Sequence, residues 1–213
     1  MRKQINRTYM IPLLLCLIPF ILSAVYYSQL PEQVAIHFDS NGNPDNYAPK
    51  LFAAFGPPLI MLVVYVYSWF RYENDPKGAG ASPAMKLVVR WAIPLLAIVM
   101  QLFILTYAVG IIVNPSLYGS LLVGLLIVAA GNYLPKCRQN YTIGIKLPWT
   151  LHDENNWKKT HYLAGWVWVA GGFLLVVNAL LEIPWLSIAV IALLVLIPFI
   201  YSYSLYRRTV KAG

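Results

Sequence analysis

Charged residues are scarce in this chain, and their scarcity excludes most classes of soluble protein. Only 11% of its 213 residues are Asp, Glu, Lys or Arg. A soluble globular protein carries about 25% charged residues, so this chain lacks the charge needed to cover a surface that faces water. Hydrophobic residues make up 59% of it, and the mean hydropathy is +0.61. The composition therefore indicates an integral membrane protein.

Cysteines are few and catalytic motifs are lacking. Cys16 lies in an apolar run and Cys137 in a polar segment, so a disulfide between them would have to cross the membrane. The neighbours of Cys137, Lys136 and Arg138, would favour its thiolate, although we favour an ordinary surface thiol. The sequence has no His-Glu-x-x-His zinc motif, no Gly-x-Ser-x-Gly motif and no phosphate-binding loop. We therefore expect no enzyme, no cofactor and no metal.

Long apolar runs are what the chain has in place of charge. A helix needs about 20 mostly apolar residues to cross a bilayer, and six such runs are present. None of them contains Lys, Arg, Asp, Glu or His, and this weighs against a proton-coupled pump. The first run exceeds the about 7–15 residues of a signal-peptide core, so we expect a retained helix. The pattern predicts an all-α integral membrane protein with six transmembrane helices, at 9–29, 51–70, 91–113, 117–134, 162–181 and 186–206.

Basic residues are distributed unevenly around these runs. Fifteen of the sixteen Lys and Arg residues fall on one side of the predicted bundle, and Lys50 alone falls on the other. By the positive-inside rule, both termini and the structured loop 132–161 are cytoplasmic, and loop 30–50 is extracytoplasmic. The same excess attracts anionic lipid heads and does not indicate direct nucleic-acid binding. The fifteen are Arg2, Lys3, Arg7, Arg71, Lys77, Lys86, Arg90, Lys136, Arg138, Lys146, Lys158, Lys159, Arg207, Arg208 and Lys211.

Loop 30–50 has the pattern of a small hairpin. The apolar residues Val34, Ile36 and Phe38 alternate with other positions, which predicts a short strand. Asn41-Gly42 is a strong hairpin signal.

The same loop contains alternating oxygen ligands that resemble the start of a calcium loop. The glycine falls at the fourth position instead of the sixth, and Lys50 stands where a bidentate Glu is required. We therefore favour an Asx-rich turn. We interpret His37 as a half-buried strand residue with a hydrogen bond, with a metal ligand or a pH-sensitive group as the alternatives. The alternating ligands are Asp39, Asn41, Asn43 and Asp45.

Two features suggest how the chain is divided. Gly56-Pro57-Pro58 interrupts the second run, where the missing N–H groups either shape a cleft or redirect the helix; we favour redirection. Residues 75–83 have the composition of a flexible linker. We therefore expect a two-helix module at 1–75 and a four-helix module at 84–213.

The longest polar interruption lies at 131–165. Pro148 keeps the preceding residue extended, and Thr150 with Asp153 three residues later fits a capping box. This predicts a helix that starts at Thr150 and continues through Trp157 and His161 into an apolar run.

The same segment contains a set of residues with characteristic types and spacing: Gly131, Asn132, Asn140, Gly144, Ile145, Lys146, Pro148, Trp149, Thr150, Leu151, Trp157, Thr160 and His161. This set resembles the signature of the SdpI family of bacterial integral membrane immunity proteins. One departure is Lys146-Leu147, where the family pattern has Arg-Thr, because Lys keeps the charge without the bidentate fork.

The hairpin region resembles a small domain of unknown function that often accompanies this family. Ile36, His37, Phe38, Gly42 and Asp45 carry that likeness.

The resemblance implies protection against a secreted peptide toxin, and it implies a cytoplasmic surface that can hold a transcriptional repressor at the membrane. A toxin arriving from outside would meet His37, Asp39, Asn41, Gly42 and Asp45. The cytoplasmic partner would meet Asn132, Asn140, Gly144, Lys146, Pro148, Trp149, Thr150, Trp157, Thr160 and His161. The alternative is a small membrane transporter or membrane-embedded enzyme that uses residues 131–165, and the sequence does not indicate an oligomeric state.

Overall fold

The computed structural model describes residues 9–39, 41–77, 83–111 and 114–212. Its contacts divide the chain into two compact units. Unit 1 comprises Met1–Glu73 and Lys86–Pro115, and unit 2 comprises Asn74–Met85 and Ser116–Gly213. The predicted modules at 1–75 and 84–213 stay a prediction.

Six helical segments of the described chain are long and apolar enough to cross a membrane, so the predicted number of transmembrane helices is confirmed. Which ends face the cytoplasm stays a prediction. Several positions used in the predictions lie outside the described residues: Arg2, Lys3, Arg7, Val113 at the end of the third predicted run, and positions 78–82 of the predicted linker. The six segments are Met10–Gln29, Lys50–Glu73, Lys86–Ala108, Pro115–Lys136, Glu154–Leu181 and Pro184–Val210.

The first of these segments in unit 1 is interrupted. It consists of α1 (Met10–Leu15), α2 (Ile18–Tyr26) and a short 3-10 turn, η2 (Tyr27–Gln29). Pro19 has no N–H to donate to the carbonyl four residues earlier, so the helical ladder is broken there. The chain passes from α1 to α2 through a turn at Cys16-Leu17.

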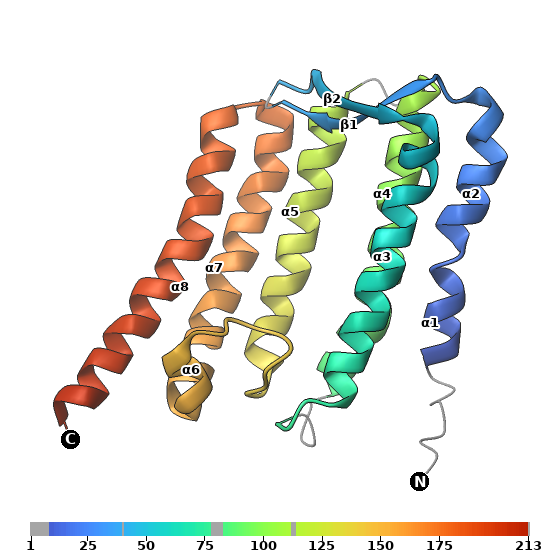
Figure 1. Ribbon diagram of the computed structural model, residues 1–213. Coiled ribbons are helices and arrows are strands. Elements are labelled where there is room, and N and C mark those ends of the chain that lie inside the picture. The colour runs from blue at the N-terminus through green and yellow to red at the C-terminus, as the bar shows by residue number, and fades with distance from the viewer. Residues whose placement is uncertain (1–8, 40, 78–82, 112–113, 213) are drawn as a thin grey trace, which may run out of the picture. The chain divides into compact units, whose positions relative to one another are not determined.

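A two-stranded hairpin follows this segment (Figure 1). Strand β1 (Gln33–Phe38) pairs antiparallel with β2 (Pro44–Pro49), with Val34 opposite Ala48 and Phe38 opposite Pro44. The predicted strand and hairpin are therefore confirmed. The hairpin lies against the helices of its unit, because Val34 is buried with Leu30, Ala53 and Leu105 and the Phe38 ring meets the Phe103 and Tyr107 rings edge-on.

Helix α3 (Lys50–Glu73) continues through Pro57 and Pro58. These prolines leave the carbonyls of Ala53 and Ala54 without their intrahelical donors. On α4 (Pro83–Ala108), Gln101 supplies the replacement, because its Nε2 lies 3.2 Å from the Ala53 oxygen and 3.1 Å from the Ala54 oxygen. The Ser23 hydroxyl also donates to the Ala54 oxygen, at 2.6 Å. A buried polar cluster thus compensates for the two prolines, and the helix does not unwind.

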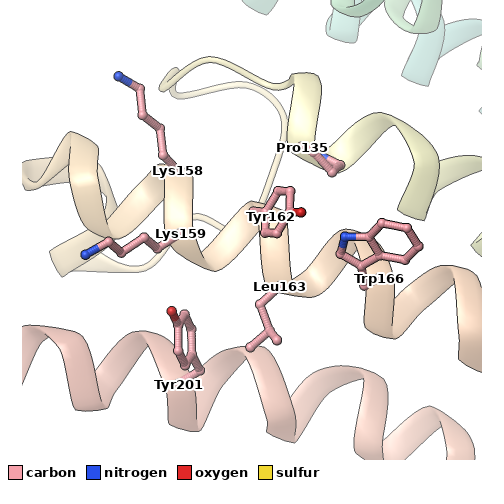
Figure 2. Close-up of a pocket in the computed structure, with 7 residues that line it drawn as sticks. All are labelled: Pro135, Lys158, Lys159, Tyr162, Leu163, Trp166 and Tyr201. Carbon is pink, nitrogen blue, oxygen red and sulfur yellow. The ribbon is translucent and has the colours of Figure 1, made fainter.

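Unit 2 contains three long helices, α5 (Pro115–Tyr133), α7 (Glu154–Leu181) and α8 (Pro184–Ala212). Glycines bring α5 and α7 together, since a Cβ on Gly131 would lie 2.7 Å from the Val169 nitrogen and one on Gly172 would lie 2.7 Å from the Val128 nitrogen. Small residues at such positions let the backbones of two membrane helices approach closely. A groove of about 480 Å³ opens between α7, α8 and the 3-10 turn η4 (Leu134–Lys136) that follows α5 (Figure 2).

Candidate functional site

The polar connection between α5 and α7 folds against the first turns of α7. Residues 137–147 have no regular secondary structure, and a short helix, α6 (Pro148–His152), follows them. A buried backbone without a helical or sheet ladder needs other hydrogen-bond partners. Side chains of the connection and of α7 supply them.

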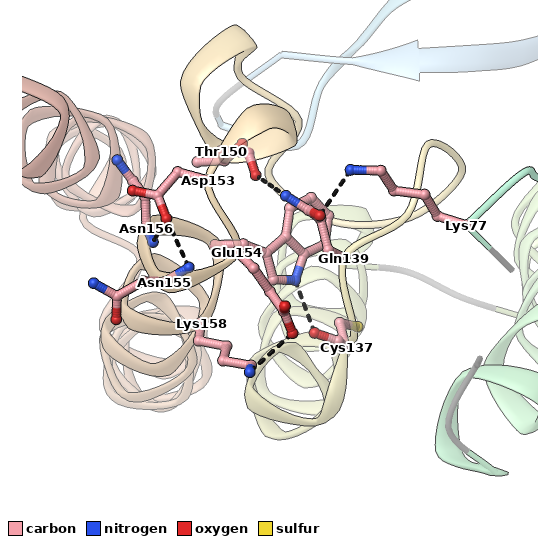
Figure 3. A network of polar contacts seen from close by, with 10 residues as sticks. Lys77, Cys137, Gln139, Thr150, Asp153, Glu154, Asn155, Asn156 and Lys158 are labelled. Carbon is pink, nitrogen blue, oxygen red and sulfur yellow. Dashed lines mark hydrogen bonds and ion pairs between the residues drawn. The ribbon is translucent and has the colours of Figure 1, made fainter. Parts of the chain in front are cut away.

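The start of α7 differs from the prediction. Asp153 is its N-cap, with its carboxylate accepting from the backbone N–H groups of Asn155 at 2.8 Å and Asn156 at 3.1 Å (Figure 3). The predicted helix start at Thr150, with Asp153 in its first turn, is wrong. Asp153 has an extended backbone (φ −118°, ψ 110°), which separates α6 from α7. The prediction that α7 runs through Trp157 and His161 into the apolar run is confirmed.

Thr150 bonds two earlier parts of the connection. Its buried hydroxyl accepts from the Leu147 N–H at 2.9 Å and lies 2.8 Å from the Ile145 carbonyl oxygen, to which it donates. Gln139 reaches the same turn, because its Nε2 donates to the Thr150 carbonyl at 2.7 Å (Figure 3). The hydroxyl of Thr150 is therefore used in fixing the fold of the connection.

His161 and Trp157 form the buried centre of the site. Their rings stack with centroids 4.0 Å apart, and the Trp157 Nε1 donates to the Cys137 carbonyl at 2.8 Å. His161 accepts the Ile145 N–H at its Nε2 (2.9 Å), and its Nδ1 faces the Trp157 carbonyl oxygen at 2.8 Å. An acceptor Nε2 beside a donor, and an Nδ1 beside an acceptor, require a neutral ring with its proton on Nδ1. Both nitrogens are thus occupied within the protein.

Gly144 lies directly on this ring pair. Its φ is +116°, which is unfavourable for any residue with a side chain. An added Cβ would lie 2.5 Å from the His161 Nε2 and 2.9 Å from the Trp157 ring. Glycine is therefore required here both by conformation and by space.

Asn140 organises the turn before Gly144. Its Oδ1 accepts from the N–H groups of Thr142 (2.8 Å) and Ile143 (2.7 Å). Its Nδ2 donates to the carbonyls of Arg138 (2.8 Å) and Ile143 (2.9 Å). Every polar atom of the Asn140 amide is thus bonded to local backbone.

A neighbouring face of α7 is joined to α8 by a second polar cluster. The Asn156 amide donates to the Ser202 carbonyl at 3.0 Å, and its Oδ1 accepts from the hydroxyls of Thr160 (2.9 Å) and Ser202 (2.8 Å). All three side chains are buried. Trp149 completes the cluster by donating from its Nε1 to the Ser202 hydroxyl at 2.7 Å and by stacking on Tyr206.

Trp149 and Thr160 were identifiable from the sequence, whereas Asn156 and Ser202 were missed. The only local signal for Asn156 is its position four residues before Thr160 on one helix face. Ser202 had no local signal, because its partners lie 46 and 53 positions away.

Two residues of the predicted linker also belong to the site. The Asp75 carboxylate accepts from the Tyr141 N–H at 2.8 Å and the Thr142 hydroxyl at 2.7 Å. Lys77 donates to the Gln139 side chain at 2.7 Å and the Leu151 carbonyl at 2.8 Å (Figure 3). Neither role could be predicted from the sequence, since these pairs are more than 60 positions apart. These bonds hold this part of the linker against residues 137–152, the connection between α5 and α7 that is called the signature connection below.

The remaining signature residues lie at the edge of this arrangement. Lys146 is exposed and donates to the Thr142 carbonyl at 3.0 Å, and Pro148 is the first residue of α6. Asn132 is exposed on α5, and its side chain has no hydrogen-bond partner among the described residues. His152 is exposed and bonds only locally, with its Nδ1 2.6 Å from the Pro148 carbonyl. The structure therefore brings His161 and Thr150 together but not His152 or Asn132.

The hairpin carries the residues predicted to face a toxin. The His37 Nδ1 lies 2.6 Å from an Asp45 oxygen, with side chains 67% and 45% exposed. The expected hydrogen bond of His37 is present, but the expectation of a half-buried side chain is wrong because it points away from the strand's packed face.

Asp39 forms the turn of the hairpin. Its Oδ1 accepts from the N–H groups of Asn41 and Asn43, both at 2.8 Å, and Gly42 has φ +81°. The hydrogen bond from the Asn43 backbone, more than any other contact, holds the pKa of the Asp39 carboxyl below its ordinary value. Its oxygens serve an Asx turn, as expected. Within the described residues, no group of three or more His, Cys, Asp or Glu could hold a metal ion.

Cys137 is a buried thiol and not a surface one. It is 8% exposed, and burial raises its pKa to about 11. The flanking basic residues do not offset this desolvation, so the thiol is not an activated nucleophile.

The signature connection and the hairpin each lie in a stretch that matches a known protein-family model. Residues 136–202, which contain the connection, α7 and most of α8, match the SdpI/YfhL protein family. Residues 14–62, which contain the hairpin, match a domain of unknown function, DUF1648. The resemblance inferred from the sequence is therefore confirmed for both regions.

Two curated Bacillus subtilis (strain 168) proteins are similar to this chain. The Immunity protein SdpI is 28% identical over 201 residues, which cover 93% of this chain and 95% of that protein. The Uncharacterized membrane protein YbgB is 40% identical over 55 residues, which cover 26% of this chain and 57% of that protein. No solved structure matches the chain significantly.

Proposed function

We propose that this chain is a multi-pass membrane immunity protein that protects its cell against a secreted peptide toxin. The observation that carries the proposal is the similarity to Immunity protein SdpI, which extends over nearly the whole of both chains. Similarity of that extent includes the hairpin and the signature connection together. The six apolar helices agree with a protein that acts in the membrane.

The proposal assigns the hairpin to the extracytoplasmic side and the signature connection to the cytoplasmic side. Its basis is the excess of Lys and Arg around the signature connection and the termini. On the hairpin side, Lys50 is paired with Glu32 at 2.7 Å, so its charge is balanced locally.

A toxin would then meet the exposed polar edge of the hairpin. His37 and Asp45 form an exposed pair there, and the Asn41 and Asn43 side chains are exposed beside the turn. The turn that presents them is ordered by Asp39 and rests on helices of unit 1 through Val34. A preorganised polar surface binds a peptide with little loss of conformational entropy.

The signature connection has a supporting role in this proposal. Thr150, Trp157 and His161 hold its backbone, which fits a rigid platform better than the active site of a membrane enzyme. Its exposed cation, Lys146, would face a cytoplasmic partner. A transcriptional repressor held at the membrane is the partner implied by the family resemblance.

Survival of a toxin-sensitive strain tests the proposal. Cells that express the chain should survive a toxin concentration that kills cells with an empty vector, with membrane levels of the protein checked by immunoblot. A chain that reaches the membrane and gives no increase in survival contradicts the proposed function.

A comparison of two single substitutions tests the role of the hairpin. Asp45→Ala should reduce protection because it removes the partner of His37 at the exposed edge. Gln33→Ala is the matched control, since Gln33 is exposed on the same hairpin but away from the turn. Equal protection by both variants would contradict the proposal that this edge of the hairpin faces the toxin.

A further inference from the structure

The groove in unit 2 is bordered by both cationic and apolar side chains. It has a volume of about 480 Å³, within the about 300–1,000 Å³ of small-molecule sites, and its lining includes Lys158, Lys159, Tyr162, Leu163, Trp166 and Tyr201. Figure 2 shows the Tyr201 hydroxyl directed to the side on which Lys159 extends. The groove thus has a charged end and an apolar end.

These side chains follow one stripe of α7. Lys159, Tyr162, Leu163 and Trp166 are spaced i, i+3, i+4 and i+7, so they share one helix face. From Lys159 to Trp166 the helix rises by about 10 Å. Tyr162 and Trp166 are 61% and 64% exposed. The order of cation, aromatic ring and apolar side chain matches the order of lipid phosphate, interface and acyl chain in a bilayer.

The charge at the head of this stripe is positive. Lys158 pairs with Glu154 at 2.8 Å, which balances one of the two ammonium groups. The side chain of Lys159 is exposed and has no hydrogen-bond or ion-pair partner among the described residues. The groove therefore presents an ammonium group available to an anion, on the side to which the Tyr201 hydroxyl is directed (Figure 2).

The stripe is separate from the signature site. Trp157, Thr160 and His161 point from the same helix into the protein and are at most 1% exposed. Substitutions in the groove therefore leave the contacts of the buried site in place.

We propose that this groove binds one anionic phospholipid. Lys159 holds the phosphate on the side to which the Tyr201 hydroxyl is directed, and the acyl chain lies along Leu163 and Trp166. The apolar lining favours a lipid over free phosphate, which would leave that surface uncovered. The proposal rests on the membrane-spanning helices and is independent of the immunity function.

Native mass spectrometry of the purified full-length chain in detergent tests this site. The probes are phosphatidylglycerol, phosphatidylcholine with the same acyl chains, and inorganic phosphate. One phosphatidylglycerol should be retained, phosphatidylcholine should bind more weakly, and excess phosphate should not displace the lipid. Lys159→Gln should weaken phosphatidylglycerol binding about fivefold, the effect of one lysine near an anionic lipid surface.

Lys86→Gln is the matched control, because it removes the same charge from an exposed position on α4 outside the groove. It should change binding less than twofold. Equal weakening by Lys86→Gln and Lys159→Gln would overturn the proposal in favour of general charge attraction. Equal binding of phosphatidylcholine, or displacement by inorganic phosphate, would also overturn it.

Discussion

Gly144 packs directly against the rings of His161 and Trp157 at the buried centre of the signature site. Its positive φ, and the 2.5 Å that would separate an added Cβ from the His161 Nε2, leave no room for a side chain. The Ile145 N–H that follows it is the donor to His161. A shift of Gly144 would therefore also break the hydrogen bond that fixes the histidine.

Gly144→Ala should lower the free energy of unfolding by about 1–3 kcal/mol from backbone strain alone, with the contact to His161 adding to that. Thermal unfolding of the purified protein in detergent measures the effect. Gly119→Ala is the control, since no atom lies within 4 Å of a Cβ at that position. Equal melting temperatures for the two variants would contradict this account of Gly144.

Asp39 gives the hairpin a dependence on pH. The folded state lowers the pKa of this carboxyl, so the unfolded hairpin binds a proton more readily than the folded one. The stability from Asp39 is therefore complete above the ordinary pKa of about 3.9 and is lost as the pH falls through the lower folded pKa.

NMR of the amide protons of Asn41 and Asn43, which donate to Asp39, measures this titration. Their chemical shifts should change with a midpoint below about 3.9, and Asp39→Asn should abolish the change. A midpoint at or above that value would show that the Asx turn does not stabilise the carboxylate.

At the scale of elements, α3 depends on α4 for two of its hydrogen bonds. Pro57 and Pro58 remove two donors, and Gln101 replaces them from the neighbouring helix. Unsatisfied carbonyls are costly inside a membrane because no water is available. The proline pair and the glutamine therefore form one structural unit, although they lie more than 40 positions apart.

Gln101→Leu should destabilise the protein by about 1–3 kcal/mol, the cost of a buried unsatisfied polar group. The same substitution should cost less in a Pro57→Ala/Pro58→Ala background, where α3 regains its own donors. Thr106→Val is a control, because the Thr106 hydroxyl bonds only carbonyls of its own helix. Unfolding in denaturing detergent is measured for the wild type, Gln101→Leu, the double-proline variant, their combination and the control, and strictly additive effects of the glutamine and proline substitutions would contradict the coupling.

An element could be predicted from the sequence when the residues that determine it lie close together along the chain. The apolar runs and the Asn41-Gly42 hairpin are local patterns, and the structure confirms both. The predicted start of α7 is wrong, because Thr150 and Asp153 are both good caps and only the contact of Thr150 with Ile145 decides between them.

The network around the signature could be predicted only in part for the same reason. The family pattern includes His161, Trp157 and Gly144 but does not say that they touch. Asp75 and Ser202 act through partners far along the chain. Pairing between residues so far apart in the chain depends on how the helices pack. No short pattern in a single sequence indicates that packing.

At the scale of the whole molecule, the account depends on which side of the membrane each connection faces. Only a hairpin that is outside can meet a secreted toxin, and only a signature connection that is inside can meet a cytoplasmic partner. The positive-inside rule supports this orientation. Cys16 and Cys137 are 1% and 8% exposed, and replacing both by alanine leaves no native thiol in a labelling test.

Labelling of single cysteines in intact cells with a membrane-impermeant maleimide tests the orientation directly. Asn46→Cys on β2 and Asn155→Cys at the start of α7 place the thiols at exposed positions, in a chain whose native cysteines are replaced by alanine. The account predicts that position 46 is labelled in intact cells and that position 155 is labelled only after the cells are permeabilised. Labelling of position 155 in intact cells, with position 46 protected, would contradict it.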